Sequence, residues 1–410
     1  MQYNAFTLAN GIRLLHIPSQ STVAHFGVVL NTGSRDETDD EIGMAHFIEH
    51  VIFKGTKKRK AYHILSRLED VGGDLNAYTT KEETAIYATF LKDDYTRAIE
   101  LLSDILKNST FPKHEIDKEK EVIIEEINSY LDSPSELIYD DFEDLIFKGH
   151  PIGRQILGTP EKIMTYDKND IERFMSNNYN TDEIVLCFVG NIPFERLKRR
   201  IQFYFEDIPE NRRKHTRSHF TDFKPQQLIL DKETYQNHTV IGTVAHEMGN
   251  KDRTSMVLLN NIMGGTSMNS RLNLAIRERH GMAYNIESTL TSYSDTGLLS
   301  IYYGTDPENA QKAQNLIFKE MKKLRDTKLG SLQLSKAKKQ LFGQISVSQE
   351  NSEEVMLSAA KSFMFFNQLS SLEQIHQKIQ SITAEQLIEV ANQSLIEDQM
   401  SILTYQSKES

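Results

Sequence analysis

A pentapeptide near residue 50 contains the side chains whose types and spacing could do chemistry. His46, Glu49 and His50 stand at positions i, i+3 and i+4, so on an α-helix they project from one face within a single turn. Two neutral imidazoles suit Zn²⁺, which takes three protein ligands in a catalytic site and leaves a fourth position for water. The order His-x-x-Glu-His inverts the commoner zinc-peptidase signature. The spacing therefore predicts a metal site with a carboxylate base beside it.

The flanking residues favour this interpretation over a solvated or core-satisfied pair of histidines. Outside the motif, residues 42–53 are nearly all apolar, which is typical of a buried helix. A buried glutamate with two histidines needs partners to offset its loss of hydration. A metal ion would supply them.

A helix expected over residues 114–131 offers a third protein ligand. Glu119 and Glu126 lie two turns apart inside its apolar arc, whereas Glu121 and Glu125 fall outside the arc, toward solvent. A carboxylate on a core-facing stripe is costly unless it is paired or binds metal. Glu126 is the better ligand candidate, and Glu119 could orient a ligand or the water. For Glu119 and for Glu126, the pattern alone supports a simple salt bridge with a neighbouring residue about as well as it supports a role at a metal site. The arc is made by Ile116, Ile123, Ile127 and Tyr130.

Several segments, in matching order, resemble the pitrilysin/insulinase-like zinc peptidases. The resemblance is strongest to their short two-domain branch, which includes the mitochondrial processing peptidases and bacterial relatives, and it covers almost the whole chain. Glu119 and Glu126 also fall at the family's distance from the motif. The matching segments are LANGIR at 8–13, GSRDE at 33–37, GMAHFIEH at 43–50, FKGT at 53–56 and GGDLNAYT at 72–79.

The resemblance implies a role for each candidate. His46, His50 and Glu126 correspond to the three protein ligands of one Zn²⁺ per chain. Glu49 corresponds to the general base and Glu119 to a supporting catalytic carboxylate. Zinc polarises a scissile carbonyl and lowers the pKa of water toward neutrality, so peptide hydrolysis needs no covalent enzyme intermediate.

The resemblance also implies residues that bind substrate. Asn76, Ala77 and Tyr78 match the family's edge strand, to which an extended peptide adds as a further strand through backbone hydrogen bonds. Phe53 and Tyr78 are expected to line substrate pockets. From the residues alone, an ordinary strand after a Gly-Gly turn is the simpler interpretation of 76–79.

The second half carries a resemblance of its own. Arg277 and Tyr284 match an arginine and a tyrosine that contact substrate near the scissile bond in the family. An arginine offers a planar fork of donors, and a tyrosine hydroxyl can stabilise the oxyanion of a tetrahedral intermediate. Residues 264–269 contain fewer glycines than the corresponding loop of many relatives, which leaves the flexibility of this loop open.

Internal repetition indicates two related modules. Residues 118–126 have a counterpart in 336–344, where Ala337 stands at the position of Glu119 and Gln344 at that of Glu126. No second His-x-x-Glu-His occurs in the sequence. The second copy therefore keeps the scaffold without the metal ligands.

We expect an α+β fold of two homologous modules, each a mainly antiparallel sheet packed with helices. The expected modules are a zinc-binding catalytic module over 1–210 and a substrate-holding module over 226–410, joined by a linker at 211–225. The linker's basic cluster is expected to be solvated rather than to bind nucleic acid, because the chain carries a net charge of −11 and lacks interleaved aromatic residues there. Strands are expected at 26–30, 84–91, 184–189 and 297–303, and helices at 95–107, 114–131, 307–325 and 331–347.

Composition sets further bounds. A chain of 410 residues with 39 % hydrophobic content can form two or three domains with real cores. No apolar run is long enough for a membrane helix, and the N-terminus lacks a signal-peptide core. The single cysteine, Cys187, excludes an intrachain disulfide and is expected in the core. A cytoplasmic setting follows most simply, with a removed targeting segment as the alternative.

The expected function is a zinc-dependent endopeptidase that cleaves peptides or unfolded segments. The alternative is a non-catalytic or partner-dependent subunit of a processing-peptidase-like complex. Relatives of the short branch pair two chains to enclose a chamber, so we expect a homodimer or a heterodimer with a related chain. The acidic balance favours basic or neutral peptides, and neither nucleic acid nor membrane is an expected partner.

Overall fold

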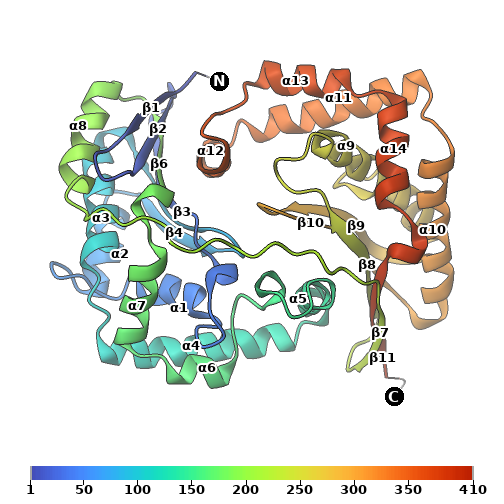
Figure 1. Ribbon diagram of the computed structural model, residues 1–410, viewed down its shortest axis with the longest axis horizontal. Helices are drawn as coiled ribbons and strands as arrows, with labels where there is room; N and C mark the ends of the chain where they lie inside the picture. Colours follow the sequence, from blue (N-terminus) through green and yellow to red (C-terminus); the bar gives the residue numbers. More distant parts are fainter. Residues whose placement is uncertain (1, 409–410) are drawn as a thin grey trace. The chain divides into compact units, whose positions relative to one another are not determined.

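The computed structural model describes residues 2–408, which form two compact units (Figure 1). The first unit comprises residues up to 128, 154–217 and 347–371, and the second comprises 129–153, 218–346 and the residues from 372 onward. The sequence suggested continuous modules, whereas each unit includes a segment from the other half of the chain.

The sheet of the first unit is antiparallel except for one pair of strands. Its order is β1-β2-β6-β3-β5-β4, and only β2 and β6 run parallel. Every residue of β6 is buried, as expected for a strand covered on both faces. Strand β4 lies at one edge. The strands are β1 (Asn4–Thr7), β2 (Arg13–Pro18), β3 (Val23–Leu30), β4 (Asp74–Thr79), β5 (Thr84–Leu91) and β6 (Ile184–Gly190).

Helices cover both faces of this sheet. On one face, Phe26 and Phe188 of the sheet share a core with Phe47 of α1, Phe174 of α7 and Phe205 of α8. The other face packs against α12 (Ser352–Phe366), a helix from the far end of the chain. The remaining helices of this unit are α1 (Met44–Val51), α2 (Ala61–Glu69), α3 (Tyr95–Asn108), most of α4 (Lys113–Leu131), α6 (Pro160–Thr165), α7 (Lys168–Asn178) and α8 (Phe194–Phe205).

The second unit repeats this arrangement. Its sheet has the order β7-β11-β8-β10-β9, again with one parallel pair, β7 and β11. Its strands are β7 (Gln227–Lys232), β8 (Asn237–Ala245), β9 (Ala283–Ser292), β10 (Gly297–Thr305) and β11 (Ser401–Ser407). Its helices are α5 (Pro134–Ile146), α9 (Arg253–Gly264), α10 (Ala310–Asp326), most of α11 (Ser331–Ser348), α13 (Leu372–Ser381) and α14 (Ala384–Ser394), with a π-helical turn at Asn273–Glu278.

The two sheets share one topology. If β1 is set aside, the spatial order in each is first, fifth, second, fourth and third strand, and the first and fifth run parallel. This confirms two homologous modules, each a mainly antiparallel sheet packed with helices. The predicted strands and helices are all present, with ends shifted by a few residues.

The modules exchange one helix each. Helix α5 comes from the first half and packs on the second sheet through Leu137, Ile138 and Phe142. Helix α12 comes from the second half and packs on the first sheet through Val355 and Met356. Helix α5 follows α4 at the same offset at which α12 follows α11. The exchange is therefore reciprocal, and each apolar sheet face is buried by a helix from the other half.

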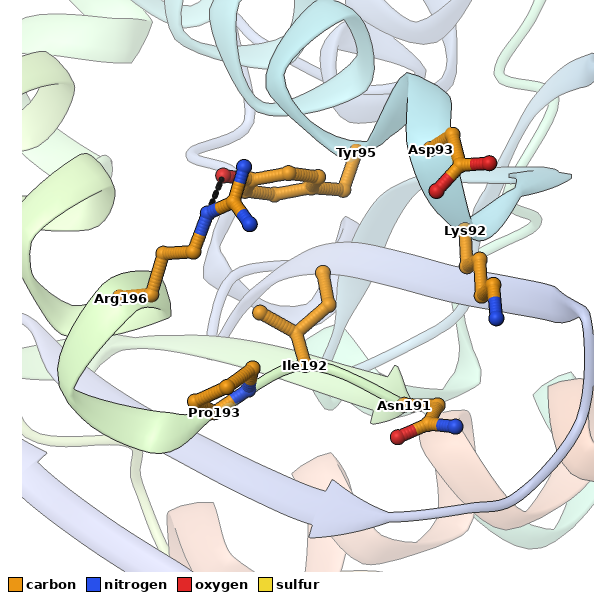
Figure 2. A pocket seen from close by; sticks show the side chains of 7 residues that line it. All are labelled: Lys92, Asp93, Tyr95, Asn191, Ile192, Pro193 and Arg196. Carbon is orange, nitrogen blue, oxygen red and sulfur yellow. Dashed lines mark hydrogen bonds between the residues drawn. The ribbon is translucent and has the colours of Figure 1, made fainter.

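A cavity of about 250 Å³ opens in the first unit between the starts of α3 and α8 (Figure 2). Arg196 Nε donates a hydrogen bond to Tyr95 Oη at 2.8 Å, and the guanidinium carbon lies 5.3 Å from the ring centre. The remaining lining residues are Lys92, Asp93, Asn191, Ile192 and Pro193. No residue of the His-x-x-Glu-His motif lines this cavity.

The expected linker is irregular, but two of its arginines are not solvated. No helix or strand lies between residue 205, where α8 ends, and residue 227, where β7 begins. Arg213 and Arg217 both pair with Asp36, and Arg217 also pairs with Glu82 at 3.4 Å. The expectation of a solvated basic cluster is wrong for these two residues, because buried carboxylates in the first unit bind them.

In the described part of the chain, no helix is both long and apolar enough to cross a membrane. Cys187 is buried on β6, as expected. Burial raises the pKa of its thiol far above the ordinary value.

Candidate metal centre

Helix α1 places the motif between the sheet and α4. The apolar positions of α1, Met44, Ala45, Phe47, Ile48 and Val51, are all buried, and they fix which side of the helix faces the core. His46 is buried too, with 7 % of its surface exposed, while Glu49 and His50 are half-buried. The imidazole rings of His46 and His50 lie 4.7 Å apart, centre to centre. One turn of helix therefore presents both rings to a common point.

Helix α4 brings Glu126 to that point. Glu126 Oε2 lies 3.8 Å from His46 Nε2 and 3.4 Å from His50 Nε2, and one ligand atom from each residue falls within 4.8 Å of the others. Ligands about 2.0–2.2 Å from a tetrahedral zinc lie roughly 3.3–3.5 Å from one another. The three side chains fit one such ion, with small adjustments at His46. On α4, Glu119 is buried and Glu126 is half-buried, whereas Glu121 and Glu125 are exposed, as predicted for those two.

The electrostatics suit a cation. Burial, and secondarily the neighbouring His50, lower the pKa of His46 to about 3, so His46 is neutral at pH 7 and can donate a nitrogen lone pair. Glu119 Oε2 lies 3.3 Å from His50 Nδ1, the ring nitrogen that faces away from Glu126. In metal sites, a carboxylate in this position typically orients the histidine by accepting a hydrogen bond from the ring nitrogen that does not face the metal.

Lys54 completes this arrangement and was not predicted. Its Nζ lies 2.8 Å from Glu119 Oε1. Burial favours the neutral form of Glu119, but hydrogen bonds from His50 and Lys54 outweigh it and lower the pKa of this carboxyl. Glu119 is thus held as an anion. The available signal was the position of Lys54 four residues after His50, inside the matching segment FKGT at 53–56.

Glu49 lies on the same helical turn but is not part of the cluster formed by His46, His50 and Glu126. Its Oε2 is buried and accepts no hydrogen bond from the residues that the structure describes. Burial raises the pKa of Glu49 from its ordinary value, and the hydroxyl of Thr79 and then the charge of His50 act in the opposite direction. A carboxylate with a raised pKa and a free lone pair is suited to accept a proton.

The proposed substrate strand lies at a sheet edge. Strand β4 pairs with β5 on one side, through Asn76 with Tyr87 and Tyr78 with Ala85, and in the described structure no strand pairs with its other side. Ala77 packs on the core that also contains α1, and Phe53 packs there as well. The Tyr78 hydroxyl instead donates to Glu83 at 3.2 Å on the other face.

Arg277 and Tyr284 belong to the second unit, and the structure therefore does not place them relative to the metal candidates. Arg277 lies in the π-helical turn and is exposed, with its Nε 4.0 Å from Glu278. Tyr284 lies on the edge strand β9, and 81 % of its surface is exposed. Both side chains are thus available for contacts outside their own unit.

In the second module, the position that corresponds to Glu126 is Gln344, which makes a hydrogen bond to a loop of its own unit. Gln344 and Gln340 on α11 each donate from Nε2 to Ser267 Oγ at 2.7 Å. Gln340 also donates to Asn269 at 3.0 Å. These bonds hold the loop at 264–269 whose flexibility the sequence left open.

Comparison with protein families identifies both halves. Residues 14–160 match the model described as insulinase (peptidase family M16), and residues 165–341 match the model described as the peptidase M16 inactive domain. The label of the second agrees with a module that lacks the metal ligands.

Whole-chain relatives and solved structures agree with this match. A Bacillus subtilis protein named uncharacterized zinc protease YmxG is 32 % identical over 395 residues, covering 96 % of each chain. The mitochondrial-processing peptidase subunit beta of Saccharomyces cerevisiae is 29 % identical over 405 residues, covering 95 % of this chain and 87 % of that one. A protease from Helicobacter pylori shares the fold with a TM-score of 0.91, at 22 % identity and 99 % coverage of both chains. This chain belongs to the insulinase family, peptidase family M16.

Proposed function

We propose that this chain is a zinc-dependent endopeptidase that hydrolyses peptides or unfolded polypeptide segments. The observation that carries the proposal is the convergence of His46, His50 and Glu126 within 4.8 Å, with Glu49 on the same helical turn. The names of the relatives as zinc proteases support the class of enzyme.

In this proposal His46, His50 and Glu126 hold one Zn²⁺ per chain. Bound zinc would supply Lewis acidity for the scissile carbonyl and for the attacking water. Glu49 accepts the proton of that water through its unpartnered Oε2 and passes it to the leaving amine. Glu119 keeps the ring of His50 in orientation, and Lys54 keeps Glu119 ionised.

The substrate would bind as an extended strand along β4, beside Asn76, Ala77 and Tyr78, with Phe53 as a pocket wall. Backbone hydrogen bonds to an edge strand tolerate many side chains, which suits peptides of varied sequence. Arg277 and Tyr284 are proposed to contact the substrate near the scissile bond and to stabilise the oxyanion. The net charge of −11 favours basic or neutral peptides over acidic ones.

The decisive experiment measures zinc content and cleavage of a mixed peptide library for the wild type and Glu49→Gln. We expect one zinc per chain in both proteins and cleavage only in the wild type, because the substituted amide keeps the shape of the side chain but cannot take a proton. A wild type without zinc would refute the proposal.

A second candidate is a subunit that cleaves only with a partner chain. It is favoured by the yeast relative, whose name makes it one subunit of a processing peptidase. In that case the wild type would bind zinc but leave the library uncut until a related chain was added. Light scattering during size-exclusion chromatography would separate a homodimer from a monomer that awaits a partner.

A further inference from the structure

The start of α1 is held by the carboxylate of Glu37, the last residue of the GSRDE segment. Glu37 Oε2 accepts a hydrogen bond from the backbone N–H of Gly43 at 2.9 Å, and Oε1 accepts one from Ala45 at 2.9 Å. Only 3 % of the surface of Glu37 is exposed. Ala45 immediately precedes His46, so the carboxylate binds the turn that carries the first metal-ligand candidate.

Other contacts clamp the same turn. Gly43 has φ of +89° and lies against Gly158, whose own φ is +76°. A Cβ on Gly43 would come within 2.8 Å of the Gly158 Cα, which no side chain tolerates without movement of the backbone. The Tyr166 hydroxyl donates to the carbonyl oxygen of Ile42 at 2.7 Å. The chain therefore enters α1 along one path.

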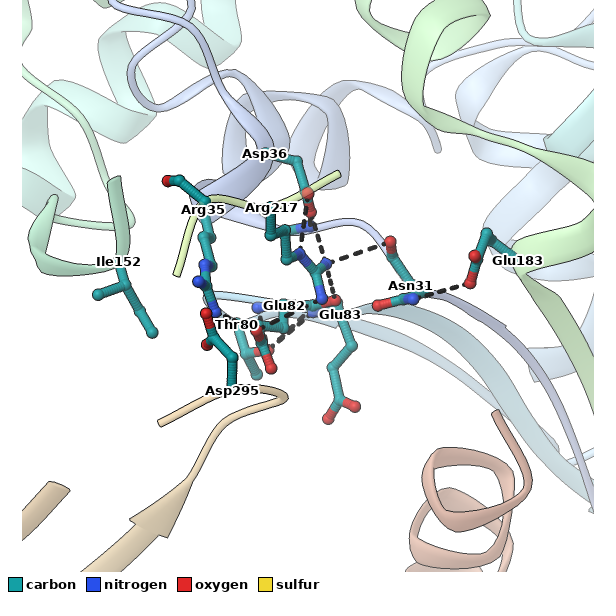
Figure 3. Close-up of polar contacts among 12 residues, drawn as sticks. Asn31, Arg35, Asp36, Thr80, Glu82, Glu83, Ile152, Glu183, Arg217 and Asp295 are labelled. Atoms are coloured by element: carbon teal, nitrogen blue, oxygen red, sulfur yellow. Dashed lines mark hydrogen bonds and ion pairs between the residues drawn. The ribbon is translucent and has the colours of Figure 1, made fainter. Parts of the chain in front are cut away.

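The residues just before Glu37, Arg35 and Asp36, are held by hydrogen bonds and ion pairs (Figure 3). Arg35 donates to Glu82 at 2.6 Å, and Arg217 donates to Asp36 at 2.7 Å and to the Glu82 carbonyl oxygen at 2.9 Å. Arg154 donates to the Glu37 carbonyl oxygen at 2.6 Å. Glu37 is thus bonded to Arg154 as well as to α1, and its neighbour Asp36 is bonded to Arg217 in the irregular segment that follows α8.

We propose that Glu37 is a positioning residue for the metal centre: its carboxylate caps α1 and thereby fixes His46 at the distance that zinc requires. Helix α1 has eight residues, and a helix this short is marginal without help from tertiary contacts. Its first turn leaves backbone N–H groups without helical partners, and the carboxylate satisfies two of them from outside the helix. Burial raises the pKa of Glu37 to about 8, against the two N–H donors, and an oxygen is available to accept in either protonation state.

The inference rests on the proposed function for its meaning, but its test does not need peptide cleavage. Glu37→Leu keeps much of the side-chain volume and removes both acceptors. Glu37→Gln keeps one acceptor and turns an amide donor toward the other N–H. The control is Asp104→Asn, which alters a buried carboxylate of the same unit whose bonds to Thr56 and Arg59 lie outside α1.

Two measurements on the purified full chain test the idea. Chelator competition gives the zinc dissociation constant well below the unfolding temperature, and hydrogen exchange on metal-free protein reports the backbone of residues 43–50. We expect zinc affinity to fall about 10- to 100-fold in Glu37→Leu, as for loss of other groups that orient a ligand, and less in Glu37→Gln. Exchange in 43–50 should be faster in both variants, while Asp104→Asn lowers the melting temperature without changing zinc affinity more than about twofold.

Unchanged exchange over residues 43–50 in folded Glu37→Leu would overturn the inference, as would unchanged zinc affinity in both variants. If the wild type bound no zinc, the proposed function would fall. The exchange result on metal-free protein would then still decide whether Glu37 anchors α1.

Discussion

Substitution of Glu126 best distinguishes a loss of metal binding from a loss of folding stability. Its side chain is 38 % exposed, so Glu126→Gln leaves no buried charge unpaired in the metal-free protein. The neighbouring Glu125 is exposed on the same helix, and Glu125→Gln makes the same change of charge one residue away. We expect the metal-free forms of both variants to unfold at the wild-type temperature.

The difference should appear only with zinc. Structural zinc binds with roughly 10–16 kcal/mol through about four ligands, so one ligand contributes about 3 kcal/mol, or about 100-fold in the dissociation constant. Zinc at about 1,000 times the wild-type dissociation constant stabilises the native state by about 4.1 kcal/mol. The same concentration is only about ten times the dissociation constant of Glu126→Gln and stabilises it by about 1.4 kcal/mol.

The missing stabilisation of about 2.7 kcal/mol corresponds to about 5–11 °C in melting temperature for a unit of this size. Differential scanning calorimetry with and without zinc measures it, and chelator competition gives the dissociation constants directly. An equal zinc-dependent shift in Glu126→Gln and Glu125→Gln would refute the assignment of Glu126 as a ligand.

Three further outcomes follow from particular contacts. Lys54→Met removes a donor that lowers the pKa of Glu119. A lowered carboxyl pKa stabilises the fold above the unfolded value of 4.5, and this stabilisation is lost as pH falls through the folded pKa. Urea unfolding should therefore find the variant about 1 kcal/mol less stable than the wild type at pH 7, with a difference that shrinks as the pH is lowered below 4.5. Native Cys187 should resist a thiol reagent until the protein is denatured, because it is fully buried and its thiol pKa is raised; stoichiometric labelling within minutes would contradict this. Phe142→Ala should cost about 3–5 kcal/mol and speed hydrogen exchange in β8 and β11 of the second unit, although Phe142 is encoded in the first half; faster exchange confined to the first sheet would show that the helix exchange is wrong.

The sequence could predict the metal candidates because their geometry is local. A period of 3.6 residues places His46 and His50 on one face of a helix, and the same period separates buried Glu119 from exposed Glu121 on α4. The strands and helices could be predicted for the same reason, since runs of β-branched residues and helical apolar stripes indicate which residues are buried. Only the approach of Glu126 to the motif required the third dimension, and the family resemblance supplied it.

The exchanged helices and the anchors of α1 could not be predicted in this way. An apolar stripe shows that α5 and α12 must be buried but carries no information about which sheet they cover. In the same way, the sequence does not show which residue a charged side chain will pair with. Arg217 lies in a polar linker, and only the fold brings Asp36 next to it. The role of Glu37 is harder still to predict, because its partners are backbone N–H groups, which every residue except proline has.

The second module offers a helix with which α1 can be compared. Helix α9 occupies the corresponding place between the second and third strands of its sheet, and its buried face is largely apolar, with Met256, Leu258 and Leu259 in the core. On α1 the same place holds His46 and Glu49, each with a buried polar atom that lacks a partner among the described residues. Each such atom costs about 1–3 kcal/mol. Since this scaffold accepts a largely apolar helix at that place, packing does not require the polar set on α1. The proposed metal site, with His46 as a ligand and Glu49 as the base, would give these two side chains a function.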